Sequence, residues 1–223
     1  MHIMEGYLPA AHAAVWTAIA APFVVHGARR LTRLTAERPQ VRLLVAAGGA
    51  YAFVLSALKL PSVTGSCSHP TGTGLGAVLF GPPVMALMGA VVLLFQALLL
   101  AHGGLTTLGA NVMSMAVAGP WAAYLSFRGV RALRGSRSLA VFMAAVVGNM
   151  VTYAVTSTQL ALAFPDPAGG VWAALVKFLG IFAVTQVPLA VMEGLLTVVA
   201  MNLLTAHSGD DLAELATMRE GAR

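Results

Sequence analysis

Long uncharged blocks alternate with short polar connections along this chain, and that alternation is the main indication of its fold. A helix needs about 20 consecutive apolar residues to cross the hydrocarbon core of a bilayer, and most of the blocks reach or approach that length. The pattern therefore predicts an all-α polytopic membrane protein. The expected spans are residues 8–28, 43–60, 73–81, 83–102, 105–127, 138–164 and 171–205.

Two connections are rich in arginine and predict how the spans are oriented. Lys and Arg in short loops mark the cytoplasmic side of a membrane protein, so both connections should lie on that side. An even number of spans must then separate them. The first connection carries Arg29, Arg30, Arg33, Arg38 and Arg42, and the second carries Arg128, Arg131, Arg134 and Arg137.

The block from Leu75 to Ala101 must be divided if the number of spans between these connections is to be even. Tandem proline at Pro82 and Pro83 cannot continue a helix and disfavours helical geometry at the residue before it, Gly81. We therefore expect a short helix, then a longer one. Broken backbone at membrane depth is tolerated where protein covers it or where it lines a cavity, so a binding cavity should lie nearby. The prediction is seven spans, with the N-terminus outside and the C-terminus in the cytoplasm.

Composition supports a membrane protein and narrows the possible chemistry. The chain is 58% hydrophobic and 9% charged, with a mean hydropathy of +0.83, which is not the composition of a soluble core. The net charge of +5 does not indicate a nucleic-acid partner, because the arginines cluster at the ends of apolar blocks. A single cysteine, Cys67, excludes an intramolecular disulfide and a cysteine-cluster metal site within one chain. Residues 1–206 should form one membrane domain, followed by a cytoplasmic tail, residues 207–223.

His2 is the most informative residue for function, because it follows a chain-starting residue. The Met1 amine, the His2 amide nitrogen and His2 Nδ1 can form two fused chelate rings in one plane, a tetragonal geometry that favours Ni(II) or Cu(II). One position of the plane stays open, and His69 is the obvious donor for it, since its loop lies on the same predicted outer face. The alternative is that His2 is simply a solvated terminal histidine.

Three segments of the sequence resemble one family closely: residues 1–9 (MHIMEGYLP), residues 66–76 (SCSHPTGTGLG) and residues 102–111 (HGGLTTLGAN). They resemble the CbiM/NikM family, the substrate-binding (S) subunits of cobalt and nickel energy-coupling-factor (ECF) transporters. The resemblance implies an N-terminal helix followed by a six-helix S-component core. It also implies a square-planar metal site formed by Met1, His2 and His69, with Co²⁺ more strongly indicated than Ni²⁺ because no second module follows the last helix.

Other residues are weaker candidates for the same site. Ser66, Ser68, His102 and Asn111 could orient the ligands, although turn and cap roles explain them equally well. Cys67 could bind the ion, but a free cysteine more often acts as a small buried hydrophobe, and methionines such as Met85, Met88, Met113 and Met115 are usually packing groups. Lys177 and Glu193 are costly in lipid and should face the bundle interior or a partner.

The resulting functional hypothesis is high-affinity capture of a divalent ion for an ATP-driven importer in the cell inner membrane. No nucleotide-binding or catalytic motif is found, so the chain is expected neither to bind nucleotide nor to be an enzyme. The family implies three kinds of partner: a transmembrane coupling subunit, two ATP-binding subunits and a small accessory membrane subunit of the cobalt branch. Small residues at four-residue spacing, Ala10, Ala14 and Ala18 or Ala46 and Ala50, could dock the coupling subunit or pack internally. A self-contained secondary transporter using Lys177 and Glu193 is the alternative, and an intramembrane metalloenzyme is a weaker one.

Overall fold

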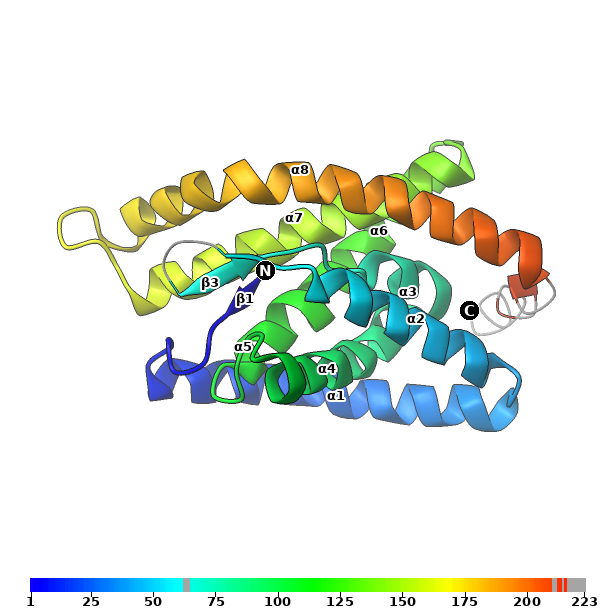
Figure 1. The fold of residues 1–223 in the computed structure, drawn as a ribbon, viewed down its shortest axis with the longest axis horizontal. Coiled ribbons are helices and arrows are strands. Elements are labelled where there is room, and N and C mark those ends of the chain that lie inside the picture. The colour runs from blue at the N-terminus through cyan, green and yellow to red at the C-terminus, as the bar shows by residue number, and fades with distance from the viewer. Residues whose placement is uncertain (62–64, 210–211, 214, 216–223) are drawn as a thin grey trace.

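The chain folds into a bundle of long helices around a short central helix. A computed structural model describes residues 1–61, 65–209, 212–213 and 215, and Figure 1 shows the arrangement. Within these residues the helices are α1 (Ala10–Glu37), α2 (Val41–Ala57), α3 (Thr73–Phe80), α4 (Pro82–Leu100), α5 (Leu108–Asn111), η1 (Val112–Ala118), α6 (Gly119–Ala132), α7 (Arg137–Ala163) and α8 (Gly170–His207).

In the part of the chain that the structure describes, four helices are long and apolar enough to cross a bilayer, and α2 is a shorter apolar helix. Their outward faces carry large apolar side chains, for example Leu43, Trp172 and Val184, each at least 74% exposed. Soluble proteins rarely expose large contiguous apolar surfaces, whereas lipid-facing helices must. The chain is therefore a multi-pass membrane protein.

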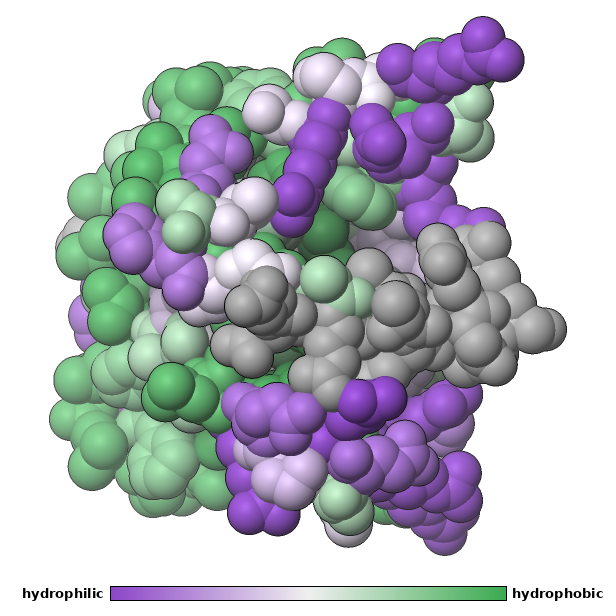
Figure 2. Space-filling model, turned by 90° about the vertical axis from the view of Figure 1, so that its right-hand side faces the viewer, coloured by the Kyte–Doolittle hydropathy of each residue, from purple (hydrophilic) through white to green (hydrophobic). Residues whose placement is uncertain are grey.

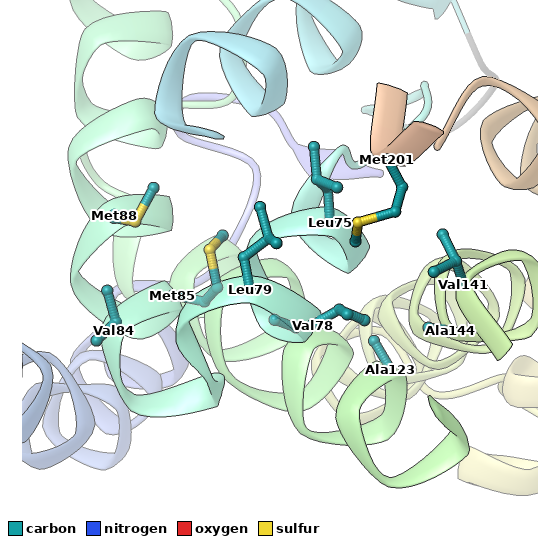
Figure 3. Packing of buried hydrophobic residues seen from close by; sticks show 11 residues of the cluster. Leu75, Val78, Leu79, Val84, Met85, Met88, Ala123, Val141, Ala144 and Met201 are labelled. Atoms are coloured by element: carbon teal, nitrogen blue, oxygen red, sulfur yellow. The ribbon is translucent and has the colours of Figure 1, made fainter. Parts of the chain in front are cut away.

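The short helix α3 lies at the centre of the bundle, and α4 begins beside it at the break expected from the tandem prolines. Gly81 has φ +87° and separates the last residue of α3, Phe80, from Pro82 at the start of α4. Figure 3 shows apolar side chains of α3 among those of α4, α6, α7 and α8. Every residue from Thr73 to Leu79 is buried, so protein rather than lipid covers this broken stretch. The core around α3 includes Leu75, Val78, Leu79, Met85, Ala123, Val141 and Met201.

The arginine-rich segments lie at the same end of the bundle, but they are not the loops that the sequence suggested. In Figure 1 the α1–α2 turn, the α6–α7 turn and the C-terminal end of α8 all lie at the right-hand end. Figure 2 shows hydrophilic residues over much of that end beside a hydrophobic flank. The expected arginine loops are largely helical, since α1 continues to Glu37 and α6 to Ala132. Arginine is a good helix former, so a helix can continue where its apolar block stops.

A small sheet and a π-helix depart from the expected all-helical pattern. Strands β1 (His2–Ile3), β2 (Leu60–Pro61) and β3 (Ser66–Ser68) form an antiparallel sheet in the order β1-β3-β2. Segments of two or three residues are too short to show strand periodicity. Element η1 is a π-helical stretch between α5 and α6, and such stretches often lie at functional sites. Both features surround the predicted metal ligands.

The predicted tail lies mostly outside the described residues. The last helix, α8, contains Pro188 and reaches His207 as one helix. Asp210, Asp211, Glu214 and Arg219 fall outside the described part of the chain.

Candidate metal centre

The N-terminal strand inserts between the helices and pairs with the strand that precedes His69. In the β1–β3 pairing, His2 lies opposite Cys67 and Ile3 lies opposite Ser66. The backbone of the next two residues is also bonded: the Met4 amide donates to the Gly65 carbonyl (2.9 Å), and the Glu5 amide donates to the Gly103 carbonyl (3.1 Å). This pairing brings the two ends of the predicted site together across more than 60 residues of chain.

Asn111 holds the N-terminal strand in place through both atoms of its side-chain amide. Its Oδ1 accepts a hydrogen bond from the Ile3 amide (2.8 Å), and its Nδ2 donates to the Ile3 carbonyl (3.0 Å). The Thr107 hydroxyl donates to the same carbonyl (2.8 Å). Asn111 ends α5 at the start of the π-helix, so this irregular stretch carries the side chain that fixes the strand.

Three imidazole rings meet beside Met1. The ring centroids of His2 and His69 are 4.2 Å apart, and His102 lies 4.6 Å from His2 and 4.9 Å from His69. These three residues are at most 1% exposed, and Met1 is fully buried. One ligand atom from each of His2, Cys67, His69 and His102 can be chosen so that all four lie within 4.8 Å of one another. The cluster is therefore compact enough to surround a single ion.

Hydrogen bonds leave one nitrogen of His2 and one of His69 available. His2 Nε2 lies 3.1 Å from the Met115 sulfur, and a thioether can only accept, so Nε2 carries the proton. His69 Nδ1 lies 2.7 Å from the Pro70 carbonyl and must likewise donate. The other nitrogens, His2 Nδ1 and His69 Nε2, are buried without a hydrogen-bond partner in the described residues. Fixing a tautomer in this way is how proteins prepare imidazoles to bind metal.

Burial also favours the uncharged form of the nitrogen donors. Desolvation lowers the pKa of the Met1 amine from 8.0 to about 5. Desolvation lowers the pKa of His2 and of His69 well below 6.5, and neighbouring positive charge adds to the effect. At neutral pH these nitrogens therefore carry free lone pairs, which is the state that binds a metal.

A buried polar network holds the His69 loop against α7 and α8. Glu193 Oε1 accepts hydrogen bonds from the Thr71 hydroxyl and the Gly72 amide (both 2.7 Å), and Oε2 accepts from the Thr71 amide (2.7 Å) and from Asn149 Nδ2 (2.5 Å). Gln186 Nε2 donates to the Asn149 oxygen (2.7 Å) and to the His69 carbonyl (3.0 Å). Every partner of the carboxylate is a donor. The network thus fixes the backbone on both sides of Pro70.

The weaker candidates from the sequence lie partly inside the histidine cluster and partly away from it. Ser66 lies in the pairing strand, whereas the Ser68 hydroxyl bonds to Thr185 on α8 (2.8 Å) and so anchors the loop. His102 Nε2 lies 3.0 Å from the Cys67 sulfur, inside the cluster. Lys177 is exposed on α8 rather than facing the bundle interior. Nothing in the sequence indicates the contact between Met115 and His2, because a methionine in an apolar helix has the pattern of a packing residue.

Comparisons with known proteins agree with a transport role. Residues 2–210 match the family model CbiM, described as a cobalt uptake substrate-specific transmembrane region. The cobalt transport protein CbiM of Streptomyces coelicolor is 62% identical over all of this chain and 97% of its own length, and that of Nostoc sp. is 61% identical over 95% of this chain and 81% of its own length. The crystal structure of a truncated transition-metal transporter is 26% identical, covers 93% of this chain and 99% of its own, and has a TM-score of 0.81.

Proposed function

Since the chain belongs to the CbiM family, we propose that it is the ion-selecting subunit of a membrane importer for Co(II) or Ni(II). Relatives named as cobalt transport proteins and a transition-metal transporter of the same fold support transport rather than enzymatic chemistry. The ion is the transported substrate, and the chain itself captures and releases it.

The arrangement of unpaired nitrogens at the N-terminus carries this proposal. The ion binds the Met1 amine, the His2 amide nitrogen after loss of its proton, His2 Nδ1 and His69 Nε2. The first three nitrogens are consecutive along the chain and form fused chelate rings in one plane, the arrangement that suits a tetragonal ion. His2 Nδ1 and His69 Nε2 are ring nitrogens without a hydrogen-bond partner among the residues that the structure describes. The ion supplies the partner that each of them lacks.

Capture from the outer face follows if the arginine-rich end lies in the cytoplasm. That orientation satisfies the preference of basic residues for the inner side, here the inner membrane. The chain then crosses seven times, counting the short α3 and the longer α4 as separate spans. The sheet with the histidine cluster lies nearer the outer face, where the ion is taken up.

Uphill import needs energy from other subunits. We propose that the chain is the S component of an ECF transporter, with a transmembrane coupling subunit, two ATP-binding subunits and the small accessory subunit of the cobalt branch. The Streptomyces relative is named for cobalt, which supports Co(II) as the physiological ion, for use in cobalamin synthesis. Alone in liposomes, the chain should bind the ion without accumulating it.

Acetylating the Met1 amine tests the site directly. Acetylation converts the free amine into an amide and should abolish the planar chelate, so Ni(II) affinity measured by titration calorimetry should fall by about 100-fold or more, since loss of even an outer partner of a metal ligand costs about 10–100-fold. His69→Ala should weaken binding as well. A matched control is His26→Ala, since His26 is an exposed histidine on α1. Unchanged Ni(II) affinity in the acetylated protein would contradict the proposal.

A further inference from the structure

Two potential ligands lie beside the proposed chelate without taking part in it. The sulfur of Cys67 and Nε2 of His102 are 3.0 Å apart, and both residues are buried. Together with one atom each from His2 and His69 they form the group whose members lie within 4.8 Å of one another. The planar chelate uses neither the thiol nor the third imidazole.

We infer that His2, Cys67, His69 and His102 form a second, overlapping ligand set that takes a tetrahedral divalent ion, Zn(II) or tetrahedral Co(II), through side chains alone. Three imidazoles and one thiolate are a typical tetrahedral donor set for such ions. The inference rests partly on the proposed function, because His2 and His69 belong to both sets.

The dimensions of the cluster fit one ion. Bonds of about 2.0 Å to nitrogen and 2.3 Å to sulfur place the ligand atoms of a tetrahedral site about 3.3–3.5 Å apart. The Cys67–His102 pair is already slightly closer than that, and the other separations, which are within 4.8 Å, must contract by at most about 1.5 Å. Rotation of side chains can supply such a movement without a change in the fold.

His102 is free to make this rotation. The other ring nitrogen of His102, Nδ1, has no hydrogen-bond partner among the residues that the structure describes, and the bond to Cys67 is the one that orients the ring. On binding, the ion displaces the thiol proton of Cys67, which leaves to solvent, and the thiolate and the imidazole then face the ion together.

The two ligand sets would separate ions by geometry. The planar set requires a deprotonated backbone amide and suits Ni(II) or Cu(II), whereas the side-chain set suits ions that accept a tetrahedron. Intrinsic affinity rises from Co(II) to Ni(II) to Cu(II) at any one set of ligands, so a site with a single geometry would favour the wrong ion for a cobalt importer. A second, tetrahedral ligand set lets Co(II) bind at a geometry that adds little to the affinity for Ni(II).

The test compares Cys67→Ser with the parent protein, each with its natural N-terminus, in titrations with Zn(II), Co(II) and Ni(II). Serine is close in size to cysteine, so the strand pairing should be kept, and the melting temperature without metal checks this. We expect Zn(II) and Co(II) affinity to fall at least about tenfold while Ni(II) affinity changes less than about twofold. The Co(II) form of the parent should show the strong visible bands of a tetrahedral site and a sulfur-to-cobalt charge-transfer band, and the variant should lose the latter. His102→Ala should repeat the selective loss of Zn(II), and His26→Ala should change nothing.

Equal effects on all three ions, or no effect on Zn(II), would overturn the inference. Either result is distinguishable from failure of the proposed function, because that failure appears as absent Ni(II) binding in the parent or as Ni(II) binding that survives acetylation of the Met1 amine.

Discussion

Replacing Glu193 by glutamine should release the loop that carries His69. The carboxylate has two oxygens, and each accepts two hydrogen bonds from Thr71, Gly72 and Asn149. An amide keeps one oxygen and presents an NH₂ group in place of the other. Two donors would then face a donor, and one backbone amide among them, that of Thr71 or that of Gly72, is left buried without a partner.

Rotation of neighbouring amides cannot remove this cost. If the Asn149 amide turns to offer its oxygen to the new NH₂ group, the nitrogen of Asn149 meets the nitrogen of Gln186. If Gln186 turns as well, the carbonyl of His69 loses its donor. The Thr71 amide stays unpaired in either case. If the NH₂ group replaces Oε1, the Thr71 hydroxyl can turn to accept from it, but the Gly72 amide has no acceptor. At least one polar group of the His69 loop is therefore unsatisfied.

A buried unsatisfied group costs about 1–3 kcal/mol, so the variant should lose at least that much of the free energy that holds the loop in place. The ion binds only to molecules in which the loop is in place. The apparent affinity therefore equals the intrinsic affinity multiplied by the fraction of molecules in that state. A loss of 2 kcal/mol corresponds to about a 30-fold weaker affinity. Titration calorimetry with Ni(II) on E193Q in detergent would measure it, together with the melting temperature.

The control is Tyr51→Phe, which removes one hydrogen bond to Thr197 on the next turn of α8 (2.9 Å) and none to the loop. We expect this variant to bind Ni(II) as the unaltered protein does. If E193Q also kept its affinity within about twofold and its melting temperature, the network would not position His69, and the reasoning would be refuted.

Three further predictions concern the N-terminal strand, the proton balance and the loop backbone. Asn111→Leu removes both side-chain bonds to Ile3, so ion affinity should fall about 10–100-fold by calorimetry, and unchanged affinity would show that Asn111 does not hold the strand. Because burial lowers the pKa of the Met1 amine to about 5, that amine is already unprotonated between about pH 6.5 and 8, and only the His2 amide proton should leave when Ni(II) binds. Calorimetry in buffers of different ionisation enthalpy should therefore count one proton released per Ni(II). A count of two would contradict the lowered pKa. Gly72→Ala should reduce ion affinity and melting temperature, since Gly72 has φ +67° and an added Cβ would lie 2.6 Å from Ala52 Cα. A variant as stable as the unaltered protein would disprove that close approach.

The helices were the more predictable part of the structure, because their signals are local. A run of apolar residues predicts a spanning helix without knowledge of the rest of the chain, and tandem proline predicts a break at Gly81 wherever the helix lies. The meeting of His2 with His69 was also anticipated, since it required only that their two loops lie on one face.

The remaining features depend on contacts between distant segments. Glu193 is 122 residues from Thr71 along the chain, and nothing in either neighbourhood indicates that they pair. The π-helical turn that carries Met115 has no sequence pattern of its own, and the strand at His2 is too short to show alternation. Such features arise from tertiary packing, which a single sequence does not display.

The burial of the histidine cluster has a consequence for the rate of capture. Met1, His2 and His69 are 0% exposed, so an ion cannot touch them until a segment that covers them opens, as strand β1 would by lifting away from Asn111 and from β3. Ion uptake would then be limited by how often that strand opens, and the observed rate would stop rising once ions are plentiful. The same cover would slow escape, so a bound ion could stay in place for longer than its affinity alone would indicate.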